Sequence, residues 1–202
     1  MGQFRRMRLV SRQYRDPLDQ VWLGAAAQIG IRVARSTEVF AAWDGEGQLI
    51  LGADETLDAD DCLGQMIFHE LCHSLVQGRE NLTRPDWGLD NTSTGDLKRE
   101  HACLRTQCSL LSPLGLRSAF APTTEHRSFY DTLPPNALDG RGEDVELARA
   151  ALERSNDPPW GPHLFRALHA TQTIITAASE FATKDDLLRI AQPSERATTT
   201  SK

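Results

Sequence analysis

The segment whose residues are best suited to metal binding or catalysis is 60–78. In it, His69 and His73 stand four residues apart and Glu70 follows the first of them. Residues four apart lie nearly above one another on an α-helix, so the two imidazoles would point the same way. Two imidazoles on one rigid face supply half of a zinc site, and a neighbouring glutamate can take a proton from a water molecule that the metal activates. We therefore predict a metal centre on a helix, with Glu70 as general base.

A third metal ligand is expected from a second helix, predicted over 95–111. Two of its polar residues, Glu100 and His101, fall on opposite flanks of its apolar stripe, which consists of Leu97, Leu104, Cys108 and Leu111. A carboxylate that borders a buried face needs a partner, because an unpaired buried charge is costly. Glu100 is therefore the preferred third ligand and His101 the alternative, with the fourth position left to water.

The elements that must position this centre begin with a helix over 16–29, for which Asp16 is the expected cap and Gly30 the expected end. Three strands are predicted to follow, at 31–35, 39–43 and 48–52. The Asp-Gly-Glu-Gly turn at 44–47 favours the backbone twist of a hairpin, so the last two strands should pair.

The helix that carries the histidines is apolar on most sides and should be buried. Asp58 or Asp60 is expected to cap it, and Gly78 to end it. Beyond it, 79–95 is predicted to be a loop whose Trp87 either lines a pocket or clamps the loop to the body. Further helices are expected at 143–154, 163–182 and 185–190, after a loop-rich segment at 115–142.

The composition is that of one globular domain: 202 residues, of which 40% are hydrophobic and 25% charged. We predict a single domain over 1–202, with a basic flexible arm at 1–15 and a disordered tail at 191–202. The net charge of -6 gives no reason to expect nucleic-acid binding. No apolar run is long enough to span a membrane, so a cytoplasmic protein is expected. The four cysteines form no Cys-x-x-Cys pair and are expected to be reduced.

The pattern of His69, Glu70 and His73 followed by an acidic residue on a later helix resembles the gluzincin branch of the zincin metallopeptidases. The resemblance implies an α+β, zincin-like fold, in which a small N-terminal sheet with a hairpin packs on the active-site helix and a mainly helical part follows. It also implies an edge strand that aligns an extended peptide over the cleft. The substrate would then be a peptide or protein.

Two narrower resemblances involve the later residues. The layout of the His-Glu-Leu-Cys-His motif at 69–73, Gln-Gly at 77–78, Asp-Trp-Gly at 86–88 and then Glu100 and Gln107 resembles the elongation factor P hydroxylase family. The stretch from Glu100 to the Leu-Leu-Ser-Pro sequence at 110–113 resembles the ImmA/IrrE metallopeptidases.

The expected activity is zinc-dependent hydrolysis of peptide bonds, with His69, His73 and Glu100 as metal ligands. An oxyanion donor is also required. Tyr130 is the preferred candidate for it, and His126 and Arg127 are the alternatives. Two histidines and a carboxylate also suit Fe²⁺, so an iron-dependent hydroxylase is one alternative function. A catalytically inactive metal-binding interaction domain is another. The sequence gives no indication of the oligomeric state.

Overall fold

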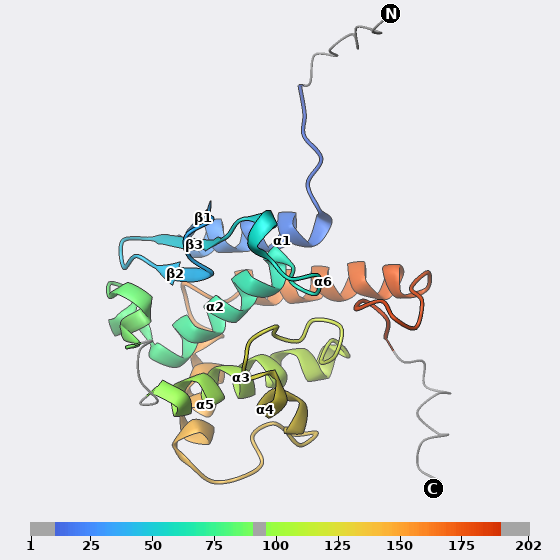
Figure 1. The fold of residues 1–202 in the computed structure, drawn as a ribbon. Coiled ribbons are helices and arrows are strands. Elements are labelled where there is room, and N and C mark those ends of the chain that lie inside the picture. Colours follow the sequence, from blue (N-terminus) through green and yellow to red (C-terminus); the bar gives the residue numbers. More distant parts are fainter. Residues whose placement is uncertain (1–10, 91–95, 191–202) are drawn as a thin grey trace, which may run out of the picture.

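A computed structural model of the chain describes residues 11–90 and 96–190, and shows an α+β fold with a small sheet and a mostly helical body (Figure 1). The tail predicted at 191–202, most of the basic arm predicted at 1–15 and the expected start of the second helix at 95 lie outside these residues. Within them, no helix is both long and apolar enough to cross a membrane.

The first helix is α1, Pro17–Ile29, as the sequence predicts. The Asp16 carboxylate caps it by accepting hydrogen bonds from the backbone N–H groups of Leu18 and Asp19. Gly30 ends it with a φ of +100°, a left-handed conformation that glycine adopts without steric cost. The apolar face of α1 packs on α2 and α6.

The sheet contains β1 (Arg32–Ser36), β2 (Ala41–Trp43) and β3 (Gln48–Gly52), in the order β1-β3-β2. The predicted hairpin is confirmed, because β2 pairs antiparallel with β3, whereas β1 runs parallel to β3. This order leaves β2 at an edge of the sheet.

Helix α2, Leu63–Gln77, crosses the centre of the molecule between the layer of α1 and the sheet and the layer of α3 and α5 (Figure 1). Cys62 is its cap, where the sequence suggested Asp58 or Asp60, and the Cys62 sulfur accepts from the Gln65 backbone N–H at 3.4 Å. Gly78 ends the helix with a φ of +79°, as expected for a glycine stop. Every residue of α2 except Glu70 is buried.

The C-terminal part contains α3 (Leu97–Leu111), α4 (Arg127–Thr132), α5 (Glu143–Arg154) and α6 (His163–Ser179). Single 3-10 turns lie at Asp54–Thr56, Arg79–Asn81, Pro85–Gly88 and Ser112–Leu114. The short α4 occupies a segment predicted to be loop, and 185–190 forms turns in place of the predicted helix.

The core is fixed around α2 by aromatic contacts. Trp22 of α1, Phe68 of α2 and Phe120 pack with ring centroids 4.9–5.9 Å apart. Gly64 permits this close approach, because a Cβ there would lie 2.8 Å from the Trp22 ring. The four cysteines are free thiols, as predicted: Cys62, Cys72, Cys103 and Cys108.

Candidate metal centre

The structure brings together the imidazoles of His69 and His73 and the carboxylate of Glu100. The two histidines project from one face of α2, with their Nε2 atoms 3.1 Å apart and exposed fractions of 9% and 7%. Glu100 approaches from the first turn of α3. Its Oε2 lies 3.2 Å from His73 Nε2 and its Oε1 lies 3.8 Å from His69 Nε2. All three side chains therefore converge on one point between α2 and α3.

These separations fit a small metal ion. Ligand atoms at zinc-bond length from a tetrahedral centre stand roughly 3.3–3.6 Å apart, and the three separations of 3.1, 3.2 and 3.8 Å each lie within about 0.2 Å of that range. Glu100 Oε1 is also buried without a hydrogen-bond donor among the described residues. An unsatisfied buried carboxylate oxygen is costly, and a cation at this point would satisfy it.

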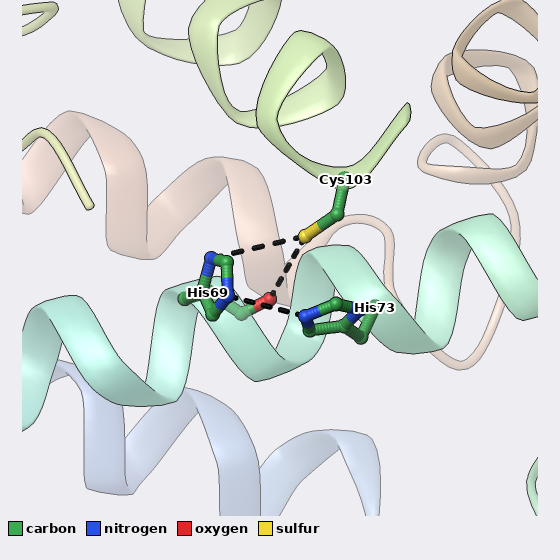
Figure 2. A group of neighbouring side chains, drawn as sticks. All are labelled: His69, His73 and Cys103. Atoms are coloured by element: carbon green, nitrogen blue, oxygen red, sulfur yellow. Dashed lines mark hydrogen bonds between the residues drawn. The ribbon is translucent and has the colours of Figure 1, made fainter. Parts of the chain in front are cut away.

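Cys103 belongs to a second grouping that could hold a metal, in which one ligand atom each from His69, His73 and Cys103 lie within 4.8 Å of one another. In Figure 2 the thiol reaches down from α3 towards the two rings on α2. Its sulfur lies 3.8 Å from His69 Nδ1 and 3.6 Å from the His69 carbonyl oxygen. Cys103 therefore meets the His69 ring at Nδ1, whereas Glu100 meets it at Nε2.

The Nδ1 position of His69 already has a hydrogen-bond partner. Gln107 Oε1 lies 3.0 Å from it, and the Gln107 side chain is fully buried. Accepting a hydrogen bond from Nδ1 places the proton of a neutral imidazole on that nitrogen and leaves the lone pair of Nε2 free. Gln107 therefore orients His69 so that its available nitrogen faces His73 and Glu100, as partners of metal-binding histidines commonly do.

The electrostatics of the three side chains are coupled. Burial on its own lowers the pKa of a histidine, and it lowers that of His69, with the neighbouring His73 acting in the same direction. For His73, burial also acts to lower the pKa, but the charge of Glu100, its hydrogen bond to His73 and the charge of Glu70 together outweigh burial and raise the pKa to about 8. Burial acts to raise the pKa of Glu100, but the charge of His73, its hydrogen bond to Glu100 and the charge of His69 together prevail and lower the pKa to about 2. The site therefore favours one positive charge beside an ionised Glu100.

The Glu70 carboxylate accepts a hydrogen bond from the indole of Trp87. Trp87 is 1% exposed, and its Nε1–H donates to Glu70 Oε2 at 3.1 Å. The Trp87 ring stacks on Trp43 of β2, with ring centroids 4.1 Å apart and an interplanar angle of 10°. Asp86 and Trp87 have φ values of +47° and +56°, a region in which bulky residues are strained and which is enriched at functional sites. Trp87 therefore fixes its loop to the sheet through the stack on Trp43, and it also lines the cavity beside the centre, so both roles considered for it apply.

A cavity of about 800 Å³ opens beside this centre, within the range of ligand-binding pockets. Helices α2 and α3 form its floor and contribute His69, Glu70, His73 and Glu100. The segment 40–42, which includes the start of β2, and the loop at 122–126 also line it. Glu70 and the three converging side chains therefore face a space that a molecule can enter.

The other predicted residues are divided between this cavity and the rest of the molecule. His126 lines the cavity, on the loop before α4. Tyr130 lies outside the lining, buried in a small core with Leu104 and Cys108, and its hydroxyl donates to the Arg117 carbonyl oxygen at 2.8 Å. Burial also raises the pKa of Tyr130. The structure thus does not bring the preferred oxyanion donor to the site.

Two alternatives from the sequence also lie elsewhere. The His101 ring stacks on Phe129 at 3.6 Å and is absent from the cavity lining. Arg127 pairs with Asp131 and donates to the Pro122 carbonyl oxygen. Gln107 and Cys103, by contrast, lie at the centre, although Cys103 was assigned no part in it from the sequence and Gln107 was named only in a family resemblance, without a role. The signal for them was present, because they follow Glu100 by seven and three residues and so share its helix face.

Comparisons with protein-family models, with curated proteins and with solved structures found no match for this chain. The relation to the zincins therefore stays a prediction from the sequence motif and its surroundings.

Proposed function

We propose that the protein is a zinc-dependent metallopeptidase with His69, His73 and Glu100 as metal ligands and Glu70 as general base. One observation carries the proposal: three ligand side chains converge at zinc-like separations on the floor of a cavity that Glu70 also lines. The edge strand β2 in the cavity wall supports a peptide substrate, since an edge strand offers unpaired backbone groups.

Glu100 is preferred to Cys103 as third ligand for two reasons. Its carboxylate lies on the Nε2 side that both imidazoles share, whereas the thiol faces the nitrogen that Gln107 engages. Glu100 also lines the cavity, whereas Cys103 is fully buried and lies outside the cavity lining.

Zinc in this position would lower the pKa of a water molecule towards about 7 and polarise a peptide carbonyl. Glu70 would accept the proton from the attacking water and deliver it to the leaving amine. The Trp87 indole would keep the Glu70 carboxylate aimed at the cavity. His126 is the proposed donor to the developing oxyanion, because it is the one of the three predicted donors that lines the cavity.

The proposal is tested by metal analysis of protein purified without added metal, together with hydrolysis of a peptide mixture monitored by mass spectrometry. We expect about one zinc per chain. The Glu70→Gln variant should retain the metal and lose hydrolysis by at least about 100-fold, the usual contribution of a general base. The control is Glu80→Gln, at an exposed carboxylate outside the cavity lining, which should hydrolyse at the wild-type rate.

Three results would contradict this function. Absence of any bound divalent metal excludes the metal centre. Undiminished hydrolysis by Glu70→Gln excludes Glu70 as the base. Bound metal without hydrolysis by the wild-type protein would instead indicate the metal-binding interaction domain considered from the sequence.

An iron-dependent hydroxylase is the second candidate, and the ligand set is the observation that favours it. Two imidazoles and one carboxylate converge here, and this combination also suits Fe²⁺ in oxygen-dependent enzymes. Iron in the purified protein, with activity that requires O₂, would select this alternative. Activity that is the same with and without O₂ would exclude it.

A further inference from the structure

We propose that the cavity selects extended peptide segments that place an apolar side chain between Phe40 and Leu97, and that these two residues determine specificity. The inference rests on the proposed function, because it names the kind of substrate that the same site would take. Three features of the cavity carry it: a strand edge whose backbone groups at Ala41 point away from the sheet, an apolar rim and an acidic lining.

The strand edge fixes the conformation of the ligand. In the hairpin, Phe40 accepts from the Gly52 N–H and Asp44 donates to the Gln48 carbonyl oxygen, so alternate residues of β2 face β3. The N–H and C=O of Ala41 therefore point away from β3. Trp43 confirms this direction, because its N–H donates to the Asp86 carboxylate outside the sheet. Ala41 lines the cavity, where an extended peptide can pair with its backbone.

The rim of the cavity supplies the apolar contact. Phe40 is 50% exposed and Leu97 is 40% exposed, and both line the cavity, one from the β2 side and the other from the start of α3. They are two of the five large hydrophobic side chains that are exposed among the described residues. Two such side chains at one cavity mouth offer a ligand side chain a place to bury apolar surface.

The charge of the lining disfavours an acidic side chain at the same place. Five carboxylates line the cavity: Glu70, Asp86, Asp96, Glu100 and Glu125. Among the described lining residues there is no lysine or arginine to offset them. A bound zinc ion would balance two of these negative charges, and the remainder would repel an aspartate or glutamate of the ligand.

Peptide hydroxamates test the inference without turnover, because the hydroxamate group chelates zinc and the adjacent residue then probes the rim. The probes are acetyl-Ala-Leu, acetyl-Ala-Gly and acetyl-Ala-Asp hydroxamates, titrated calorimetrically into zinc-loaded protein. We expect the Leu probe to bind about tenfold more tightly than the Gly probe, as partial burial of one apolar side chain allows. The Asp probe should bind more weakly than the Gly probe.

The Phe40→Ser/Leu97→Ser double variant should bind the Leu and Gly probes within about threefold of each other. Phe181→Ser is the matched control, since Phe181 is 86% exposed and lies outside the cavity lining, and it should keep the tenfold preference. Equal binding of the Leu and Gly probes to the wild-type protein, or a preference that survives the double substitution, overturns the inference and leaves the proposed function standing. If none of the hydroxamates binds zinc-treated protein, the proposed metal site is wrong and the inference falls with it.

Discussion

The proposed third metal ligand, Glu100, is preferred on contacts between single residues. Glu100 faces the Nε2 atoms of both histidines, whereas Cys103 faces His69 Nδ1 and His101 stacks on Phe129. We expect Glu100→Ala to lose bound zinc, and Cys103→Ala and His101→Ala to retain it. Equilibrium dialysis followed by metal analysis measures all three variants in parallel. Zinc lost from Cys103→Ala but kept by Glu100→Ala would reverse the assignment.

Gln107 is expected to control zinc affinity without touching the metal. Its Oε1 fixes the His69 ring through Nδ1, and loss of such a partner typically weakens metal binding about 10–100-fold. Gln107→Met removes the acceptor at similar volume and should show this loss in competition with a chromogenic chelator. Gln107→Glu keeps an acceptor oxygen and should bind zinc within a few-fold of wild type. Equal losses in both variants would mean that Gln107 acts only through packing.

At this scale the sequence predicted the residues that depend on helical periodicity. His69 and His73 share a helix face by spacing alone, Glu70 was selected as the carboxylate next to the first histidine, and Glu100 was selected because a carboxylate bordered an apolar stripe. Tyr130 was selected from a loop segment, where no periodicity fixes the direction of a side chain. The Tyr130 ring instead packs in a small apolar core, and its hydroxyl donates a hydrogen bond to the Arg117 carbonyl oxygen.

Among the elements, the loop that carries Trp87 is expected to position the general base. Trp87→Phe should keep the stack on Trp43 but remove the hydrogen bond to Glu70, at a cost of about 1 kcal/mol in the free energy of unfolding. If Glu70 is the base, kcat should fall about tenfold with little change in KM, because an interaction with the reacting carboxylate is lost while substrate binding is not. Steady-state kinetics on a peptide substrate separates the two constants.

Trp43→Phe is the matched control for this loop. It makes the same change on the other ring of the stack, but the Trp43 Nε1–H donates to the Leu82 carbonyl oxygen and not to Glu70. Its kcat should stay near the wild-type value at a similar loss of stability. A similar fall of kcat in both variants would show that the stack, and not the hydrogen bond, supports activity.

Local sequence signals predicted where most helices and strands lie, but they did not predict every residue at which an element begins or ends. The cap and stop residues of α1 and the turn between β2 and β3 are encoded within a few residues, and these features were predicted. The predicted cap of α2 was wrong, because Cys62 has the required extended backbone and its sulfur accepts a hydrogen bond from the Gln65 N–H. The parallel pairing of β1 with β3 joins strands that are not consecutive in the sequence. No turn connects them directly, so the local sequence does not predict this pairing.

For the molecule as a whole, the contacts of Glu100 with His69 and His73 join α3 to α2. The stability of the metal-free chain should therefore depend on pH through these contacts. The pKa of His73 is raised from 6.5 to about 8, so its contribution is fully present below pH 6.5 and is lost as pH rises through 8. The pKa of Glu100 is lowered from 4.5 to about 2, so its contribution is present above pH 4.5 and is lost as pH falls through 2. The pair is therefore most stabilising between pH 4.5 and 6.5.

Thermal unfolding of chelator-treated protein at several pH values measures this dependence, with Glu100→Gln as the reference that removes the charged partner of His73. The difference in Tm between wild type and variant should be largest between pH 4.5 and 6.5. At pH 9 this difference in Tm should be smaller by roughly 4–8 °C at this chain length, which corresponds to a loss of about 2 kcal/mol in the free energy of unfolding. Saturating zinc should remove this loss at alkaline pH, because the metal then holds α2 to α3 through neutral histidines. A difference in Tm that does not vary with pH would show that the His73–Glu100 pair does not stabilise the metal-free fold.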